Sequence, residues 1–254
     1  MALSELSGLA LDPELGAGAE ALAFARQYEG ESPQTVLRDA IRNHYAGRIA
    51  LVSSFGADSA VLLHMVSVVD PSTPVIFVET GKHFPQTLRY RDLLVDRLGL
   101  TGVRDARPDP EALAAVDAGG MLWMSDTDAC CHARKVVPLA TALKGFDAWI
   151  SGRKRFQSST RAALPVFEVE EGRVKVNPLA SWTASDILAY AKEHDLPPHP
   201  LVAEGYPSIG CLPCTSKVAP GEDPRSGRWR GQEKTECGIH LSLGASGAGP
   251  VTGA

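Results

Sequence analysis

Short apolar runs alternate with longer amphipathic segments along the first two-thirds of the chain. The apolar runs predict buried strands, and the longer segments, with apolar positions three and four residues apart, predict helices. The predicted strands span 48–55, 74–80, 100–107 and 146–152. The predicted helices span 19–46, 56–69, 84–99 and 128–145. This alternation is typical of an α/β fold in which a parallel, twisted sheet carries helices on both faces.

Residues with special backbone preferences refine this pattern. Pro138 is expected to kink or split the helix over 128–145, because proline lacks a backbone N–H. Glu171-Gly172 lies between two alternating runs and predicts a β-hairpin. Thr183 begins an amphipathic helix over 182–195 as its N-cap, and a carboxylate three residues later favours a capping box.

Length and composition indicate one globular domain. The chain has 254 residues, with 44% hydrophobic and 22% charged residues, which is enough for one substantial core. We predict an α/β domain over 19–222, a loosely ordered N-terminus over 1–18, a functional C-terminal segment over 223–240 and a flexible tail over 241–254. The charge of −5 argues against a broad nucleic-acid surface. No apolar run approaches the ~18 residues of a membrane span, and no secretory signal is seen, so we expect a cytoplasmic protein.

The first loop between a predicted strand and helix, "SSFGADS", is a candidate anion site. Open α/β sheets bind ligands beyond the carboxyl ends of their strands, and a helix N-terminus offers free N–H groups. The candidate residues are Ser53, Ser54, Gly56, Asp58 and Ser59. A tight turn in which Asp58 or Ser59 only caps the helix is the alternative.

A second loop, "ETGKHF", follows the next predicted strand. Its candidate binding residues are Thr80, Gly81 and Lys82. Lys82 is placed to meet an anion or a ribose, although an ordinary surface lysine is the alternative. His83 is expected to be structural or exposed rather than catalytic.

A third candidate loop is the basic segment "SGRKRFQSSTR", which contains no acidic residue. Its cations are Arg153, Lys154, Arg155 and Arg161. Such a run is often only a solvated face. The embedded Gly152, Gln157 and Ser158 favour a binding loop instead.

The five cysteines carry the most specific pattern. Cys130 and Cys131 are adjacent, at a Cα separation of about 3.8 Å, which is shorter than a relaxed disulfide requires. Cys211 and Cys214 form a CxxC pair, and Cys237 stands apart. Two pairs and one separate thiol suggest a site with four ligands. A [4Fe–4S] cluster suits adjacent ligands better than zinc does, because its irons offer several attachment points. Zinc and unliganded cysteines remain the alternatives.

Basic residues accompany these cysteines. Arg134 and Lys135 each follow one of the paired cysteines by four residues, so each should lie near it on a helix surface and could face an anionic substrate. Arg225, Arg228 and Arg230 gather near the C-terminus, and guanidinium groups match phosphate and sulfate oxygens. The fifth cysteine, expected in an exposed and mobile tail, is either a nucleophile or a thiol without a role. If it is a nucleophile, Lys234 should favour its thiolate and Glu236 should oppose it.

Together these motifs resemble those of the assimilatory sulfonucleotide reductases, which have the adenine-nucleotide α-hydrolase fold related to ATP pyrophosphatases. The resemblance covers residues 45 to 240. Its most specific part is "ECGIH", residues 236–240, which matches the family's ECG[IL]H tail. The Cys-Cys and CxxC pairs match the cluster-bearing branch of the family, which uses adenosine 5′-phosphosulfate (APS).

The resemblance implies roles for individual residues. Cys237 would be the nucleophile, and the other four cysteines would hold a [4Fe–4S] cluster. Substrate contacts would come from Lys135, Arg225, Arg228, His240 and the Gly152–Ser158 loop, which matches the family's G-R-x-x-Q-S pattern with one extra residue. The first loop mixes features of both branches of the family.

The implied reaction belongs to sulfate assimilation and cysteine biosynthesis. The thiolate of Cys237 would attack the sulfur of APS, release AMP and form a thiosulfonate, from which thioredoxin or a glutaredoxin-like reductant would free sulfite. The phosphorylated substrate PAPS is the first alternative. A tRNA-thiolating pyrophosphatase-fold enzyme and a non-enzymatic iron–sulfur sensor are the others. Assembly into a homo-oligomer is left open.

Overall fold

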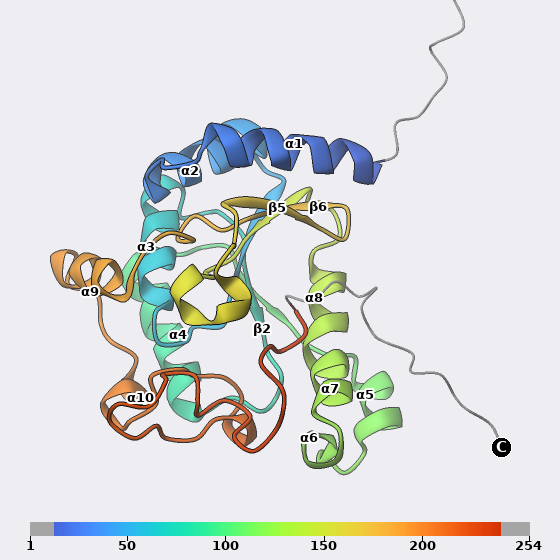
Figure 1. Ribbon diagram of the computed structural model, residues 1–254. Helices are drawn as coiled ribbons and strands as arrows, with labels where there is room; N and C mark the ends of the chain where they lie inside the picture. Colours follow the sequence, from blue (N-terminus) through green and yellow to red (C-terminus); the bar gives the residue numbers. More distant parts are fainter. Residues whose placement is uncertain (1–12, 240–254) are drawn as a thin grey trace, which may run out of the picture.

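A six-stranded sheet forms the centre of the protein in the computed structural model, which describes residues 13–239 (Figure 1). The strand order is β3-β2-β1-β4-β6-β5. Every neighbouring pair is parallel except β5 and β6, which form an antiparallel hairpin at one edge. The strands are β1 (Ile49–Ser53), β2 (Val75–Val78), β3 (Val103–Ala106), β4 (Ala148–Ile150), β5 (Phe167–Glu170) and β6 (Arg173–Val176). The predicted α/β fold is confirmed.

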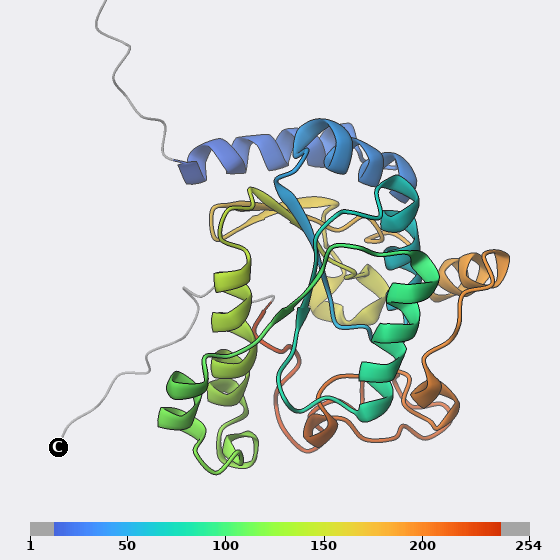
Figure 2. The ribbon, with the colours of Figure 1, turned by 180° about the vertical axis from the view of Figure 1, so that it is seen from behind.

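Helices cover both faces of this sheet (Figures 1 and 2). Helices α3 and α4 lie on one side and α8 on the other, while α1 and α2 lie across one end. The helices are α1 (Pro13–Gln27), α2 (Pro33–Asp39), α3 (Ser59–Val69), α4 (Pro85–Leu98), α5 (Pro110–Asp117), α6 (Leu122–Ser125), α7 (Thr127–Cys131), α8 (Val137–Ala142), α9 (Ala184–Glu193) and α10 (Pro200–Ala203).

Two hydrophobic cores arise because side chains alternate between the faces of each strand. On β1, Leu51 points into the large core with α3, whereas Ala50 points into a smaller core. On β2, Phe77 joins the large core and Ile76 the small one. Leu139 of α8 completes the small core. Strands buried on both faces carry near-continuous apolar runs, which is why the sequence pattern located them.

The predicted helix over 128–145 is a continuous helical segment with a change of pitch. Helix α7 passes into a π-helical stretch, His132–Val136, and then into α8. A kink or split was expected at Pro138, and the segment changes from π to α just before this residue, which lies in the first turn of α8. Proline has no N–H to donate and its ring would crowd the carbonyl four residues earlier. The wider π turn immediately before it relieves both problems.

Other local predictions are confirmed by backbone geometry. Glu171 and Gly172 have φ values of 54° and 73°, as a tight β5–β6 hairpin requires. Thr183 caps α9 in a capping box with Asp186. The N-terminal helix, by contrast, begins at Pro13 rather than at residue 19. Helices α5, α6 and α10 were not predicted, since they are short and lie in polar or turn-rich sequence.

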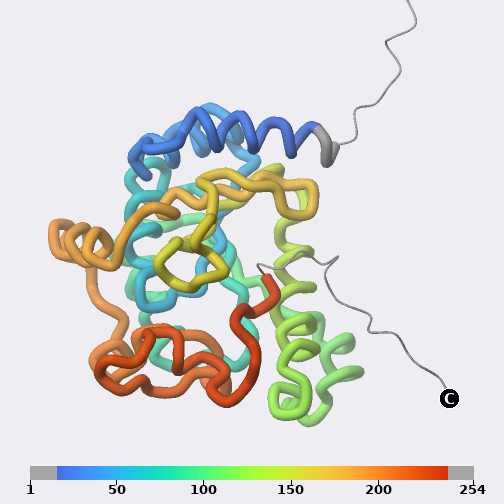
Figure 3. The backbone as a smooth tube through the Cα atoms, viewed as in Figure 1, coloured from blue at the N-terminus to red at the C-terminus, as the bar shows by residue number. Residues whose placement is uncertain are grey.

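The chain from residue 204 to 239 crosses the lower end of the sheet and then runs beside α8 (Figure 3). It is held by an isolated bridge between Thr215 and Arg228 and by a hydrogen bond from Trp229 N to Cys214 O of 3.1 Å. Trp229 is 4% exposed. Cys237, expected in an exposed tail, is half-buried in this segment. No helix among residues 13–239 is long and apolar enough to cross a membrane.

Candidate active site

A cavity of about 540 Å³ opens beyond the carboxyl ends of β1 and β4. The strand order reverses between these two strands, since β2 and β3 follow on one side of β1 and β6 and β5 follow on the far side of β4. Such a switch point is where open α/β sheets bind ligands, because the loops there diverge. Its lining comes from the first loop, the basic loop after β4, α9 and the C-terminal segment.

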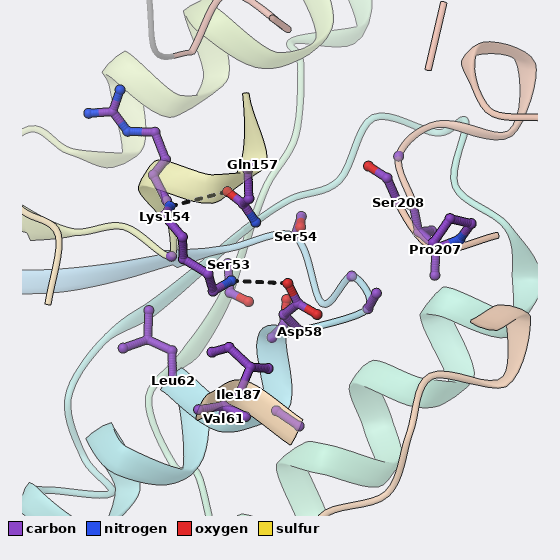
Figure 4. A pocket seen from close by; sticks show the side chains of 18 of the residues that line it. Ser53, Ser54, Asp58, Val61, Leu62, Lys154, Gln157, Ile187, Pro207 and Ser208 are labelled. Carbon is purple, nitrogen blue, oxygen red and sulfur yellow. Dashed lines mark hydrogen bonds and ion pairs between the residues drawn. The ribbon is translucent and has the colours of Figure 1, made fainter. Parts of the chain in front are cut away.

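The first loop lies against the cavity as predicted. The lining includes all five of its candidate residues, Ser53, Ser54, Gly56, Asp58 and Ser59. Asp58 is the N-cap residue of α3 but makes no side-chain capping bond. Its carboxylate instead accepts a hydrogen bond of 3.1 Å from Lys154 Nζ (Figure 4). This pairing joins the first loop to the basic loop across the cavity.

Lys154 is a site residue whose role the sequence did not reveal. It is 2% exposed, and Figure 4 shows it reaching Asp58 with Leu62 and Ile187 nearby. Burial lowers its pKa, and the charge of Asp58 partly offsets that effect. The run of cations around it signalled a binding loop but could not say which cation would turn inward.

The three candidate binding residues of the second loop do not line the cavity. Lys82 Nζ donates to Gly120 O at 2.7 Å, and so ties the loop to the α5–α6 connection. Thr80 is buried, with its Oγ1 3.4 Å from Cys211 Sγ. Neither these residues nor Gly81 reaches the cavity, whereas His83 does. The expectation that Lys82 meets a ligand is not supported, because its ammonium group is engaged elsewhere.

The basic loop contributes several groups to the cavity. Gly152, Arg153 and Gln157 line it, and Ser158 does not. Arg153 pairs with Glu168 of β5. Burial lowers the pKa of Arg153 to about 10, and the nearby positive charge of Arg161 adds to the effect. Two guanidinium groups thus lie close together at this wall.

Of the four cysteines in the two pairs, Cys211 lines the cavity. Cys130, Cys131 and Cys211 are buried and Cys214 is half-buried, and all are free thiols. Burial raises the pKa of Cys131 to about 11, while Lys135 opposes the rise. Among residues 13–239, no three Cys, His, Asp or Glu side chains come close enough to hold a single metal ion. The two cysteine pairs are nevertheless near enough to influence each other's titration.

The two cations after the cysteine pair face different partners. Arg134 is buried and forms a two-point contact with Asp117, at 2.6 and 3.1 Å. It does not line the cavity, so the expectation that it could face a substrate is not supported. Lys135 does line the cavity. Burial alone would lower its pKa, but the thiolates of Cys211, Cys237 and Cys131 outweigh it and raise the pKa.

The C-terminal segment places Cys237, Arg225 and Arg228 on the cavity wall. The guanidinium of Arg228 stacks over Trp229 at 4.5 Å. Arg225 lies close enough to Cys237 for their charges to interact. Lys234, expected to favour the Cys237 thiolate, pairs with Asp128 instead. His240 lies outside the described residues.

Glu236, which was expected to oppose the thiolate, is compensated in the fold. Its carboxylate binds Arg161 through both oxygens, each at 2.7 Å, and both residues are buried. Arg161 belongs to the basic segment "SGRKRFQSSTR" and Glu236 to "ECGIH", and 75 positions separate the two residues. No local pattern could pair them.

The fold and this cavity define an α/β protein with a candidate ligand site at the switch point of its sheet. Residues 48–217 match the phosphoadenosine phosphosulfate reductase domain. The chain belongs to this family, and the resemblance found in the sequence is confirmed. The chain is 54% identical over 231 residues to an adenosine 5′-phosphosulfate reductase of Mesorhizobium japonicum, with 91% of each chain covered. It is 44% identical to a phosphoadenosine 5′-phosphosulfate reductase of Gloeobacter violaceus, over 85% of this chain and 92% of that one.

Solved structures agree on the fold. A phosphoadenylyl-sulfate reductase from Candida auris, crystallised with phosphate, is similar with a TM-score of 0.66 and 31% identity, covering 79% of this chain and 97% of that one. An FMN adenylyltransferase from Candida glabrata, in complex with ATP, has a TM-score of 0.51 at 14% identity, covering 87% of this chain and 84% of that one. The second likeness concerns the fold alone.

Proposed function

We propose that the protein reduces APS to sulfite and AMP in assimilatory sulfate reduction, through a thiosulfonate on Cys237. The observation that carries the proposal is the meeting of Cys237, Lys135, Arg225 and Arg228 at one cavity, from segments far apart in the chain. A thiol nucleophile beside three cations suits attack on an anionic sulfur centre, because the cations stabilise charge on the group being transferred.

The reaction proceeds as two displacements. The Cys237 thiolate attacks the sulfur of APS, a sulfur–sulfur bond forms, and the sulfur–oxygen bond breaks so that AMP leaves with the electron pair. A thiolate of thioredoxin or a similar dithiol then attacks Cys237 Sγ and sulfite departs with its electron pair. The second thiol of the reductant resolves the mixed disulfide. Two electrons thus come from the dithiol, and Cys237 returns to its thiol form. Such chemistry suits a reducing compartment such as the cytoplasm.

APS is favoured over PAPS by the relatives. The two relatives from Mesorhizobium japonicum and Chelativorans sp., at 54% and 52% identity, are named adenosine 5′-phosphosulfate reductases. Anaerobic steady-state assays with APS and PAPS side by side, with thioredoxin as reductant, test the choice. We expect the higher kcat/KM with APS. A higher kcat/KM with PAPS would identify PAPS as the preferred substrate. Absence of sulfite release from both compounds would reject the proposed activity.

We propose further that Cys130, Cys131, Cys211 and Cys214 hold a [4Fe–4S] cluster. Their free, mostly buried thiols supply the four thiolates that such a cluster takes, and burial raises the pKa of three of them, so that binding iron must displace protons. Adjacent ligands such as Cys130 and Cys131 suit the several irons of a cluster better than a single zinc ion. When bound, the cluster would supply a fixed charge beside Lys135, and the displacements above balance without an electron from it.

Replacing Arg228 with Ala should weaken catalysis without unfolding the protein. Within the described residues, its buried Nε has no hydrogen-bond partner, which suits a group that waits for a ligand. Loss of one charge-assisted hydrogen bond costs about 1.5 to 3 kcal/mol, so kcat/KM for APS should fall roughly 10- to 150-fold. The matched control is Arg230→Ala, since Arg230 is exposed and pairs with Glu222. If both variants have the same kcat/KM for APS, Arg228 does not contact the substrate.

A further inference from the structure

Glu236 is held by two arginines that also line the cavity. Arg161 binds both of its carboxylate oxygens, and Arg225 Nη2 lies 3.6 Å from Oε2. Arg225 also donates to the carbonyl of Thr235 at 2.8 Å. The residue immediately before Cys237 is thus fastened to the basic loop, and the position of the thiol depends on this contact.

Arg161 and Arg225 need a negatively charged partner. Burial lowers the pKa of Arg225, and the positive charge of Arg161 is the next contribution in size. Arg153, which Glu168 neutralises, is the third guanidinium at this wall. A buried guanidinium without a counter-charge is costly, so some carboxylate or phosphate must face Arg161. In the described structure Glu236 fills that place, and the same two-point geometry would suit a phosphate group.

We propose that Glu236 is a positioning residue that competes with the phosphate group of the nucleotide for Arg161 and Arg225. The inference rests on the proposed function. With the cavity empty, the carboxylate neutralises the arginines and holds the Cys237 segment in a resting position. A bound nucleotide takes over the guanidinium groups and frees the segment to bring the thiol to the reacting sulfur. Departure of AMP lets Glu236 recapture the arginines.

If Glu236 competes with the nucleotide phosphate, its replacement should strengthen nucleotide binding. A purely structural ion pair predicts the opposite. Glu236→Gln removes the competing charge and leaves Arg161 in need of an anion, so AMP should bind about tenfold more tightly than to the wild type. At the same time kcat for APS should fall, because AMP that binds more tightly leaves the cavity more slowly. Loss of a purely structural contact would instead weaken AMP binding along with turnover. The control is Glu233→Gln, which removes the same charge from an exposed position in the same segment.

Calorimetric titration of the full-length protein with AMP decides the matter, with APS kinetics measured in parallel. Tighter AMP binding by Glu236→Gln and unchanged binding by Glu233→Gln support the competition. Equal or weaker binding by Glu236→Gln overturns it and leaves the proposed function intact. Failure of the wild type to bind AMP overturns the proposed function as well. If the Gln variant does not fold, Glu236→Asp replaces it: the shorter carboxylate cannot keep both contacts, so AMP should again bind more tightly, and wild-type affinity would overturn the inference.

Discussion

Cys237→Ser is expected to abolish sulfite release while leaving nucleotide binding intact. A serine hydroxyl is a far weaker nucleophile than a thiolate, and the structure places Cys237 at the cavity wall with Lys135 and Arg225 close by. The carboxylate of the neighbouring Glu236 is itself neutralised mainly by Arg161, which binds both of its oxygens. Activity should fall below detection, and AMP should bind the variant as it binds the wild type.

Mass spectrometry provides the direct measurement. Wild-type protein mixed with APS and no reductant should carry an adduct of about 80 Da, the mass of SO₃, on the peptide that contains Cys237. The Ser variant should carry none. An adduct on another cysteine would transfer the nucleophile's role to that residue. Turnover by the Ser variant would reject the covalent route altogether.

Cys214→Ser is expected to remove the iron and with it the brown colour. Anaerobically purified wild-type protein should contain about four irons per chain, as one cubane requires, and the variant should contain almost none. Cys214 is half-buried, and serine is close to it in size, so the fold should survive the change. Iron and acid-labile sulfide analysis, with thermal unfolding of each protein, tests this.

Cys237→Ser is the matched control for the cluster, since it removes the one cysteine outside the two pairs. It should keep wild-type iron and colour. If the wild-type protein contains one zinc per chain and no sulfide, the four cysteines form a zinc site and not a cluster. Full iron content in Cys214→Ser would show that Cys214 is not a ligand.

The sequence by itself determined the architecture and the kinds of chemistry present. Strands buried on both faces must be apolar, and hairpin and capping residues such as Gly172 and Thr183 act through bonds within a few positions. Such features are local, so the pattern located them. The count of cysteines and the "ECGIH" motif likewise require only the order of residues. The match over 48–217 confirmed the family to which they pointed.

Only the tertiary structure decided which partner each charged group meets. Lys82 was expected at a ligand and binds Gly120 O, while Lys234 was expected beside the thiol and pairs with Asp128. Lys154, one cation among several in its loop, is the one buried against Asp58. A charged side chain can satisfy itself with any nearby opposite group, and the sequence does not say which distant segment will be near. Packing of the sheet, the basic loop and the C-terminal segment makes that choice.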